Sequence, residues 1–521
     1  MAEQSSHIAV PVAGVTMALL AALGPTAAVA APPPADTTGV TGPSAAAASR
    51  FVPGPCPEPP EPIEALTTAR CGVLEVPENR DRPDGRTIRL AVAVIPSVSA
   101  KPAPDPVVFM AGGPGGDVFD DIPFLVSSGL NKDRDLIVMA QRGNLYDQPN
   151  LACPELDHFY ARSVGLPSYA PQTERLMADA VKRCRDRLTA DGTDLSAYNS
   201  TENAADFADL RTALGYKQWN VYGHSYGSNL ALTYLRLHPQ GIRAVALDSA
   251  APAQFVSLPF AWANAREGLD NVFKACEAEP RCESRYPDLE RTLNEQVRKL
   301  EAKPLTLNVR PPQGGAPVKV VLDGGALVNL LVAKAIPFAD FPAAIDELAR
   351  GNPERLAKAR AAGSVEVDGQ TAHGLTQSVV CGEWVPGHST SDVLKAGREA
   401  FPAWPESAQA QAPQLPFQDE LCRIWNVPDR TAGVRVPTVS SVPVLFVNGT
   451  FDMKTGASWA PKTARTLSNS TTVQVPGIGH WVVPQSPCAQ KVLASFLADP
   501  TAPDTGCVAG LRWEPFTITP E

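Results

Sequence analysis

The sequence predicts an α/β protein with a mostly parallel central sheet, helices on both faces of the sheet, and a large, mostly helical insertion. Short apolar runs bounded by turn residues, such as 106–110 and 136–140, alternate with segments of helical spacing. This alternation is typical of strands buried in a parallel sheet. From about residue 252 the alternation stops, and strand-like runs return only at 442–447 and 471–475. A sheet interrupted by an insertion explains these observations.

Length and composition indicate a large globular protein. The chain has 521 residues, of which 44% are hydrophobic and 19% are charged, which is too apolar for a disordered chain. Its formal net charge is −10 and it has no basic run. We therefore expect no nucleic-acid partner, because such partners select for basic surfaces.

The N-terminus has the pattern of a secretory signal peptide. An apolar stretch at 8–23 is followed by Ala28-Val29-Ala30, an A-x-A cleavage signature. The stretch is short and broken by Pro11, so we expect no stable membrane insertion after cleavage. The segment before it lacks Lys and Arg, which departs from the usual pattern. We expect a signal peptide at 1–30, a flexible leader at 31–50, and a secreted or periplasmic protein.

The rest of the chain is expected to form a core in two parts, at 51–251 and 436–521, around a helical cap insertion at 252–435. The expected strands are 71–77, 87–95, 106–110, 136–140, 219–222, 244–247, 442–447 and 471–475. The expected helices are 173–189, 203–214, the segment after residue 225, 262–275, 287–301, 324–336, 340–350, 354–361, 456–467 and 488–498, with a hairpin near 305–322.

The stretch Gly223-His224-Ser225-Tyr226-Gly227 contains a Gly-x-Ser-x-Gly pattern between an expected strand and an expected helix. A sharp strand-to-helix turn strains the serine and exposes its hydroxyl above the sheet edge. Glycines are needed on both sides because a Cβ there would collide with the neighbouring strand or helix. The pattern alone also fits a plain buried serine turn, but its position favours a nucleophile.

A nucleophilic serine needs a general base, and the base needs a carboxylate to orient it. Asp452 follows the expected strand at 442–447, and His480 follows the expected strand at 471–475. The order Ser225, Asp452, His480 is that of a hydrolase with a nucleophile elbow. Asp248 is the alternative acid, because it also ends an expected strand after the serine.

Backbone N–H groups must also stabilise the negative charge that acyl transfer creates. One donor is expected at Tyr226, directly after the serine, and the other on the loop Ala111 to Gly116, directly after the strand at 106–110. Four glycines let this loop approach a substrate closely. No Gly-Lys-Ser/Thr follows, which disfavours a nucleotide-binding loop.

Ten cysteines in an exported chain favour disulfides over a metal site, and none forms a C-x-x-C pair. Pairing in sequence order is our expectation, although other connectivities and buried free thiols remain alternatives. The expected pairs are Cys56–Cys71, Cys153–Cys184, Cys276–Cys282, Cys381–Cys422 and Cys488–Cys507.

Together these motifs carry a family resemblance. Gly112-Gly113-Pro114-Gly115-Gly116, Gln141-Arg142-Gly143, the Gly223–Gly227 stretch, Asp452-x-x-Thr455 and Gly479-His480 resemble the proline iminopeptidase and tripeptidyl aminopeptidase branch of the α/β hydrolases. The closer resemblance is to the secreted tripeptidyl-aminopeptidase-like group. It rests on Cys71-Gly72 before Val76-Pro77, Pro149-x-Leu-x-Cys153, Cys276 with Cys282, and Cys381-x-Glu383-Trp384.

The resemblance implies an α/β-hydrolase fold and a serine exopeptidase that releases short N-terminal pieces from peptides, with no metal and no cofactor. It implies Ser225 as nucleophile, Asp452 as acid, His480 as base, and the N–H groups of Gly113 and Tyr226 as the oxyanion hole. Support for the oxyanion loop is implied for Gly112, Pro114, Gly115, Gly116 and Arg142.

An aminopeptidase must also offset the charge of a free α-ammonium with carboxylates. Glu383 and Asp117 are the candidates, although either could be an ordinary structural carboxylate. The sequence departs from the family pattern at Ala140, at 144–146, at Asp117 and at Gly456. The departure at 144–146 leaves open a carboxylesterase or lactonase that uses the same triad. A catalytically inactive binding protein with the same fold is a further alternative, against which the intact triad argues.

Overall fold

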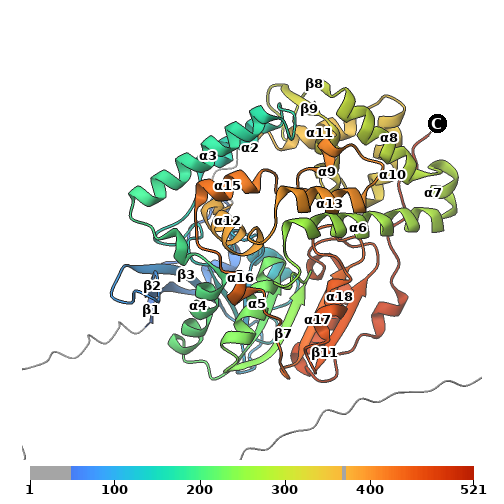
Figure 1. The fold of residues 1–521 in the computed structure, drawn as a ribbon. Coiled ribbons are helices and arrows are strands. Elements are labelled where there is room, and N and C mark those ends of the chain that lie inside the picture. The colour runs from blue at the N-terminus through green and yellow to red at the C-terminus, as the bar shows by residue number, and fades with distance from the viewer. Residues whose placement is uncertain (1–48, 366–370, 521) are drawn as a thin grey trace, which may run out of the picture. The chain divides into compact units, whose positions relative to one another are not determined.

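A computed structural model describes residues 49–365 and 371–520 of the chain (Figure 1). The predicted signal peptide at 1–30 therefore lies outside the described residues, as does the predicted leader up to residue 48. Arg50, the last residue of that predicted leader, already begins a strand, β1 (Arg50–Pro53), which pairs antiparallel with β2 (Arg70–Pro77).

Within the described residues, nine strands form one sheet in the order β1-β2-β3-β5-β4-β6-β7-β10-β11. The remaining strands of this sheet are β3 (Thr87–Ile95), β4 (Val107–Met110), β5 (Leu136–Met139), β6 (Trp219–His224), β7 (Ile242–Asp248), β10 (Val444–Gly449) and β11 (Ser470–Val475). Every neighbouring pair from β5 to β11 is parallel, whereas β1, β2 and β3 pair antiparallel with their neighbours. The predicted mostly parallel sheet is confirmed.

Alternating side chains of the buried strands divide between two apolar layers. In β4, Val107 and Phe109 lie in one layer, while Val108 and Met110 lie in the other, because successive strand residues point to opposite faces. Helices α4 (Ser200–Ala213), α5 (Tyr226–Leu237) and α17 (Trp459–Ala464) cover one face. Helices α1 (Ile122–Ser127) and α18 (Pro487–Ala498) cover the other. The central strands β4, β5 and β10 are therefore buried on both faces, which explains why their sequences are continuous apolar runs.

The segment between β7 and β10 is mostly helical, as predicted, and has an apolar core of its own. In Figure 1 most of these helices lie on one side of the sheet. The α-helices of the whole segment are α6 (Leu258–Ala278), α7 (Pro280–Arg285), α8 (Leu289–Ala302), α9 (Gly324–Val332), α10 (Phe341–Ala349), α11 (Glu354–Ala362), α12 (His373–Val379), α13 (Thr390–Ala400), α14 (Glu406–Gln409), α15 (Gln418–Trp425) and α16 (Thr431–Val434). The predicted hairpin is present as β8 (Leu305–Val309) and β9 (Val318–Leu322), which pair antiparallel.

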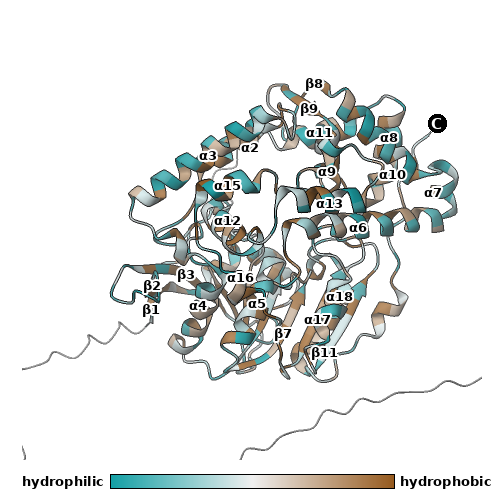
Figure 2. Ribbon diagram, viewed as in Figure 1, coloured by the Kyte–Doolittle hydropathy of each residue, from teal (hydrophilic) through white to brown (hydrophobic). Residues whose placement is uncertain are grey.

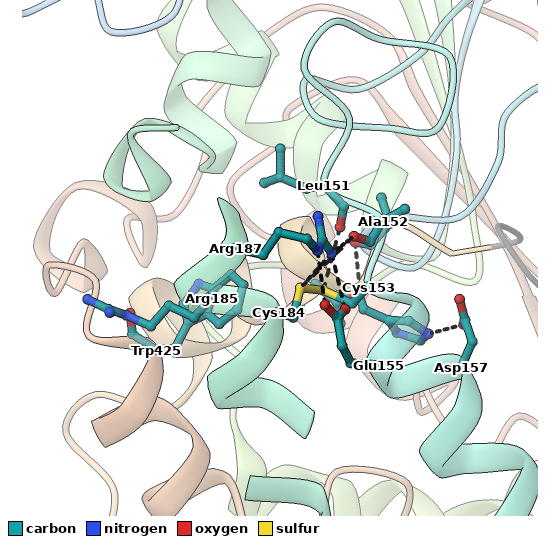
Figure 3. The surroundings of a disulfide bond; sticks show 12 residues. Leu151, Ala152, Cys153, Glu155, Asp157, Cys184, Arg185, Arg187 and Trp425 are labelled. Carbon is teal, nitrogen blue, oxygen red and sulfur yellow. Dashed lines mark hydrogen bonds and ion pairs between the residues drawn. A yellow bond between two sulfur atoms is a disulfide. The ribbon is translucent and has the colours of Figure 1, made fainter. Parts of the chain in front are cut away.

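Two helices from before the elbow pack with this segment. Helices α2 (Pro154–Ser163) and α3 (Pro171–Ala190) share an apolar cluster with α12 and α15. In Figure 3, Arg185 of α3 lies beside Trp425 of α15, to whose carbonyl its Nε donates a 2.9 Å hydrogen bond. The division into core and cap at 252–435 stays a prediction, and the packing places α2 and α3 with the predicted cap helices.

Five disulfides are present, and they join Cys56–Cys71, Cys153–Cys184, Cys276–Cys282, Cys381–Cys422 and Cys488–Cys507. The Cys153–Cys184 bond fixes the start of α2 to α3, beside an ion pair between Arg187 and Glu155 (Figure 3). Cys153, Cys184 and Glu155 are close enough together to resemble a metal site. Both sulfurs are already bonded to each other, so neither is a free thiolate ligand.

Hydropathy follows this layering. In Figure 2 brown, hydrophobic residues run along strands such as β7, and hydrophilic residues are prominent on α3, α7 and α15. None of the helices in the described part of the chain has the length and apolar character that crossing a bilayer requires.

Candidate active site

The carboxyl ends of the parallel strands bring the predicted residues to one edge of the sheet. The loop Ala111–Gly116 follows β4, Ser225 follows β6, and Asp248 ends β7. Asp452 lies three residues after β10, and His480 lies five residues after β11. Ligands bind at this edge in open α/β sheets, so it is the candidate active site.

Ser225 occupies the strained turn that the sequence predicted. Its backbone has φ 54° and ψ −122°, at the residue directly before α5, a conformation that costs a non-glycine residue energy. A Cβ on Gly227 would lie 1.9 Å from the carbonyl oxygen of Met110, and one on Gly223 would lie 2.4 Å from that of Gly227. Helix α5 thus starts in contact with β4 and β6, and only glycine fits at both positions.

Asp452 and His480 contact each other directly. The His480 Nδ1 lies 2.9 Å from Asp452 Oδ2, and since a carboxylate only accepts hydrogen bonds, Nδ1 is the donor and Nε2 is left as the acceptor. Asp452 Oδ1 accepts from the backbone N–H groups of Lys454 (2.8 Å) and Thr455 (2.9 Å). Burial alone would raise the pKa of the Asp452 carboxyl, but His480 and these hydrogen bonds lower it to about 2. Asp452 is therefore an anion at neutral pH.

The rival acid, Asp248, does not contact His480. Its Oδ1 accepts from the N–H of Val482 and its Oδ2 from the N–H of Val483, both at 2.8 Å. The hydroxyl of Tyr222 donates to Oδ2 at 2.9 Å. Burial raises the pKa of Asp248. Asp248 thus anchors the loop that carries His480 and is not the partner of its ring.

The glycine loop after β4 lies against the elbow. A Cβ on Gly112 would be 3.1 Å from both His224 Nδ1 and Ser225 Cβ. Gly113 has φ 115° and Gly115 has φ 90°, values that favour glycine. Gly113 and Tyr226 line the same cavity as Ser225, and the Tyr226 N–H, at the first residue of α5, has no preceding helical turn to accept it. Both residues therefore lie beside the serine, and their role as oxyanion donors stays a prediction.

Among the described residues, Arg142 bonds segments other than the glycine loop, and its support of that loop stays a prediction. The guanidinium is fully buried and bonds both oxygens of Asp206 at 2.8 Å, with further bonds to the carbonyls of Glu78 and Ala197. Asp206 is on α4, so the strongest partner of this buried charge lies away from the glycine loop.

Three other side chains, two of them near Arg142 in the sequence, donate hydrogen bonds to carbonyls of the glycine loop. The Gln141 side chain donates to the Ala111 carbonyl at 2.8 Å, and the Asn144 side chain donates to the Gly116 carbonyl at 2.6 Å. From α12, Thr376 Oγ1 donates to the Pro114 carbonyl at 2.7 Å. The sequence marked this neighbourhood through Gln141-Arg142-Gly143 and the departure at 144–146, but not which side chains make the contacts.

Glu383 has both carboxylate oxygens occupied by hydrogen bonds. They accept from the N–H (2.7 Å) and the hydroxyl (2.6 Å) of Ser200, whose hydroxyl also contacts the Tyr226 hydroxyl at 2.9 Å. Burial raises the pKa of Glu383 to about 7, although the Ser200 hydrogen bonds counteract it. Glu383 belongs to a π-helical turn, Val380–Trp384, and its contacts brace Tyr226 through Ser200.

The other predicted amine-binding residue, Asp117, caps the turn after the glycine loop. Its Oδ1 accepts from the N–H of Phe119 at 2.9 Å. Burial, with a smaller contribution from the nearby Asp120, raises the pKa of Asp117 to about 7, although the Phe119 hydrogen bond counteracts it. Neither Asp117 nor Glu383 is among the described residues that line the cavity of Ser225.

The cavity that contains Ser225 has a volume of about 250 Å³ and lies between the sheet edge and the helical segment. Leu258, Ala261 and Asn264 of α6 line it together with Val332 of α9. Most of its lining is apolar, which suits a small or extended organic substrate.

Sequence reasoning missed the aromatic side chains that position the His480 loop. Trp481 has φ 65°, its ring stacks on His224 with ring centroids 4.8 Å apart, and its backbone N–H donates to Ser249 Oγ at 2.9 Å. The His224 ring lies 5.0 Å from that of His480. Because His224 directly precedes Ser225, these contacts keep His480 beside the elbow. The position of His224 directly before the serine was the sequence signal that could have pointed to these contacts.

The fold and the residues gathered at this edge are those of a hydrolase with a nucleophile elbow. Residues 105–487 match the family described as the alpha/beta hydrolase fold, and the chain belongs to this family. The predicted fold class is thereby confirmed.

Curated relatives refine this placement. The chain is 30% identical to the serine protease Hip1 of Mycobacterium tuberculosis over 209 residues, which are 38% of each protein. It is 27% identical to a tripeptidyl aminopeptidase of Streptomyces coelicolor over 202 residues, 36% of this chain and 35% of that protein. A probable proline iminopeptidase of Streptomyces coelicolor is 33% identical over 87 residues, 17% of this chain and 26% of that protein.

The aligned parts thus span well under half the length of these relatives. They support a serine hydrolase, and they confirm the resemblance to the peptidase branch that the motifs predicted.

Proposed function

We propose that the protein is an exported serine hydrolase that forms an acyl-enzyme on Ser225. The observation that supports this most is the 2.9 Å contact between His480 Nδ1 and Asp452 at the same sheet edge as the strained Ser225. With Nδ1 held by Asp452, the His480 Nε2 takes the proton from the Ser225 hydroxyl as it attacks a carbonyl carbon.

In this proposal the Gly113 and Tyr226 N–H groups stabilise the resulting oxyanion, after which His480 protonates the leaving group. Water then attacks the acyl-enzyme with the same base, and the serine is released. The preformed donors need no reorganisation as charge develops, which is the main physical basis for the rate that we expect.

Peptides are the first candidate substrates, with cleavage at or near the N-terminus. The names of the relatives and the motifs shared with them support this choice. Export is supported by the signal-like N-terminus and by the five disulfides, which persist in oxidising compartments.

A small ester or lactone is the second candidate. The lining of the Ser225 cavity favours it, because the described residues there include no carboxylate to pair with a peptide α-ammonium.

A substrate panel distinguishes these two candidates. The specificity constant kcat/KM would be measured for aminoacyl and tripeptidyl anilides, for their N-acetylated forms, and for short acyl esters, with Ser225→Ala as the control. An aminopeptidase loses most of its activity when the amine is acetylated, because the ammonium contact is lost. Equal rates with free and acetylated amines would refute the aminopeptidase proposal, and activity in Ser225→Ala would refute the serine mechanism.

A further inference from the structure

Lys454 is the charged residue that lines the Ser225 cavity. Among the described lining residues the others are apolar or uncharged polar, for example Thr376, Gln414 and Thr455. Lys454 lies between Asp452 and Thr455, and its backbone N–H bonds the Asp452 carboxylate. Its side chain therefore begins next to the candidate acid.

The Lys454 ammonium is unpaired among the residues that the structure describes. It makes no hydrogen bond and no ion pair with any residue in the part of the chain that the structure describes. The carboxylates nearby are already occupied. Both oxygens of Asp452 accept hydrogen bonds from the backbone, Thr455 and His480, and those of Glu267 accept from the N–H and the hydroxyl of Ser458.

The surroundings of this ammonium are confined. The side chain is accessible to solvent, yet crowding by the protein lowers the pKa of Lys454, with Asp452 partly offsetting the effect. Its charge also contributes to the lowered pKa of the buried His224, after the larger effects of burial and His480. Lys454 therefore acts electrostatically on the residue adjacent to Ser225.

An unpaired ammonium in a mostly apolar cavity disfavours a second cation and favours an anion. Glu383 and Asp117, which could have neutralised a substrate amine, bond Ser200 and Phe119 and do not line this cavity. Since Lys454 presents a compact charge with three donors, a carboxylate is a matching ligand.

We propose that Lys454 determines substrate specificity by binding a substrate carboxylate close to the scissile bond. The matching substrate class is an acyl compound, peptide or ester, that carries a carboxylate on its acyl group or on a short leaving group. A short peptide with a free C-terminus and an acidic acyl residue both meet this description. The inference rests on the proposed serine hydrolase, because it concerns the cavity of the same Ser225.

Two pairs of esters test it. For the leaving-group side, the butyrate ester of 3-hydroxybenzoate is compared with that of 3-hydroxybenzamide. For the acyl side, the mono-p-nitrophenyl ester of terephthalate is compared with the corresponding ester of 4-carbamoylbenzoate. The rigid rings prevent the carboxylate from attacking its own ester, and each pair differs in one charge. Each kcat/KM would be measured for wild type, Lys454→Gln, Lys454→Glu and the control Lys491→Gln, which removes an exposed lysine of α18.

We expect wild type to prefer the carboxylate of at least one pair by roughly tenfold or more, the usual scale for a hydrogen bond to a charged group. Lys454→Gln should abolish this preference, Lys454→Glu should reverse it, and Lys491→Gln should keep it. A wild type without preference in either pair would overturn the proposal. So would a Lys454→Gln enzyme that slows both members of a pair equally, since that result indicates a general electrostatic effect on the reaction.

Neutral p-nitrophenyl butyrate separates this proposal from the proposed function. Hydrolysis by wild type but not by Ser225→Ala would uphold the serine hydrolase even if the carboxylate preference is absent. Fluorophosphonate labelling of Ser225 in the Lys454 variants verifies that their sites are folded.

Discussion

Replacing Asp452 with asparagine should nearly abolish catalysis while leaving the protein folded. Asparagine keeps an oxygen for the N–H groups of Lys454 and Thr455, which lie 2.8 and 2.9 Å from Asp452 Oδ1. Its NH2 group then replaces Oδ2, which the His480 Nδ1 contacts at 2.9 Å. Because an amide NH2 only donates, His480 must place its proton on Nε2, and that atom can no longer accept the proton of Ser225.

The expected loss in kcat is roughly 10⁴-fold, the scale of this change in a serine triad. It corresponds to about 5 kcal/mol of transition-state stabilisation. The cost in folding is smaller. The Asp452 pKa falls from 3.8 to about 2 in the folded protein, which corresponds to about 2 kcal/mol of stability at neutral pH that is lost as pH falls from about 4 toward 2.

The assay is kcat for a p-nitrophenyl ester together with urea unfolding, for Asp452→Asn and for Asp248→Asn as the matched control. Asp248 anchors the backbone of Val482 and Val483, so its replacement should reduce stability and cost kcat less than a hundredfold, roughly, since the His480 tautomer is unchanged. If Asp452→Asn keeps near-normal kcat while a folded Asp248→Asn loses it, the assignment of the acid is wrong.

Two further predictions concern packing and burial. Gly227→Ala should lower the melting temperature and the activity together, because its Cβ would lie 1.9 Å from the Met110 carbonyl oxygen; a variant as stable and active as wild type would contradict the close packing of the elbow. Burial raises the pKa of Glu383 from 4.5 to about 7. The contribution of this group to the free energy of unfolding is therefore most favourable below pH 4.5. Up to about 3 kcal/mol of it is lost as pH rises through 7. Urea unfolding at pH 5 and pH 8 should show a smaller loss for Glu383→Gln than for wild type, and equal losses would refute the raised pKa.

The local sequence pattern was sufficient to predict the central strands of the sheet and the sharp turn at Ser225. The runs at 106–110 and 136–140 became β4 and β5 almost residue for residue, because a strand buried on both faces has a continuous apolar sequence. The order of Ser225, Asp452 and His480 could be predicted because residues after parallel strands meet at one sheet edge.

Contacts between distant segments could not be predicted in this way. Glu383 accepts hydrogen bonds from the N–H and the hydroxyl of Ser200, which is 183 residues away in the sequence. It also belongs to a π-helical turn, which no sequence periodicity predicts. The resemblance assigned Arg142 to the support of the glycine loop. In the structure its buried guanidinium is paired with the buried carboxylate of Asp206 on α4.

Some elements were missed for a local reason. Helices α12, α14, α15 and α16 have at most eight residues each, so the apolar spacing extends over too few turns to be recognised. The first strand, β1, has only four residues and no buried side chain. Its sequence therefore lacks an apolar pattern, and its first residue was assigned to the flexible leader.

Covalent labelling tests the central proposal most directly. Wild-type protein would be treated with a fluorophosphonate, and the modified residue would be located by mass spectrometry of its peptides, with Ser225→Ala and His480→Ala treated in parallel. The proposed mechanism predicts one adduct on Ser225 in wild type, none in Ser225→Ala, and a labelling rate reduced by orders of magnitude in His480→Ala. A wild-type protein that stays unlabelled, or that is labelled on another residue, would contradict it.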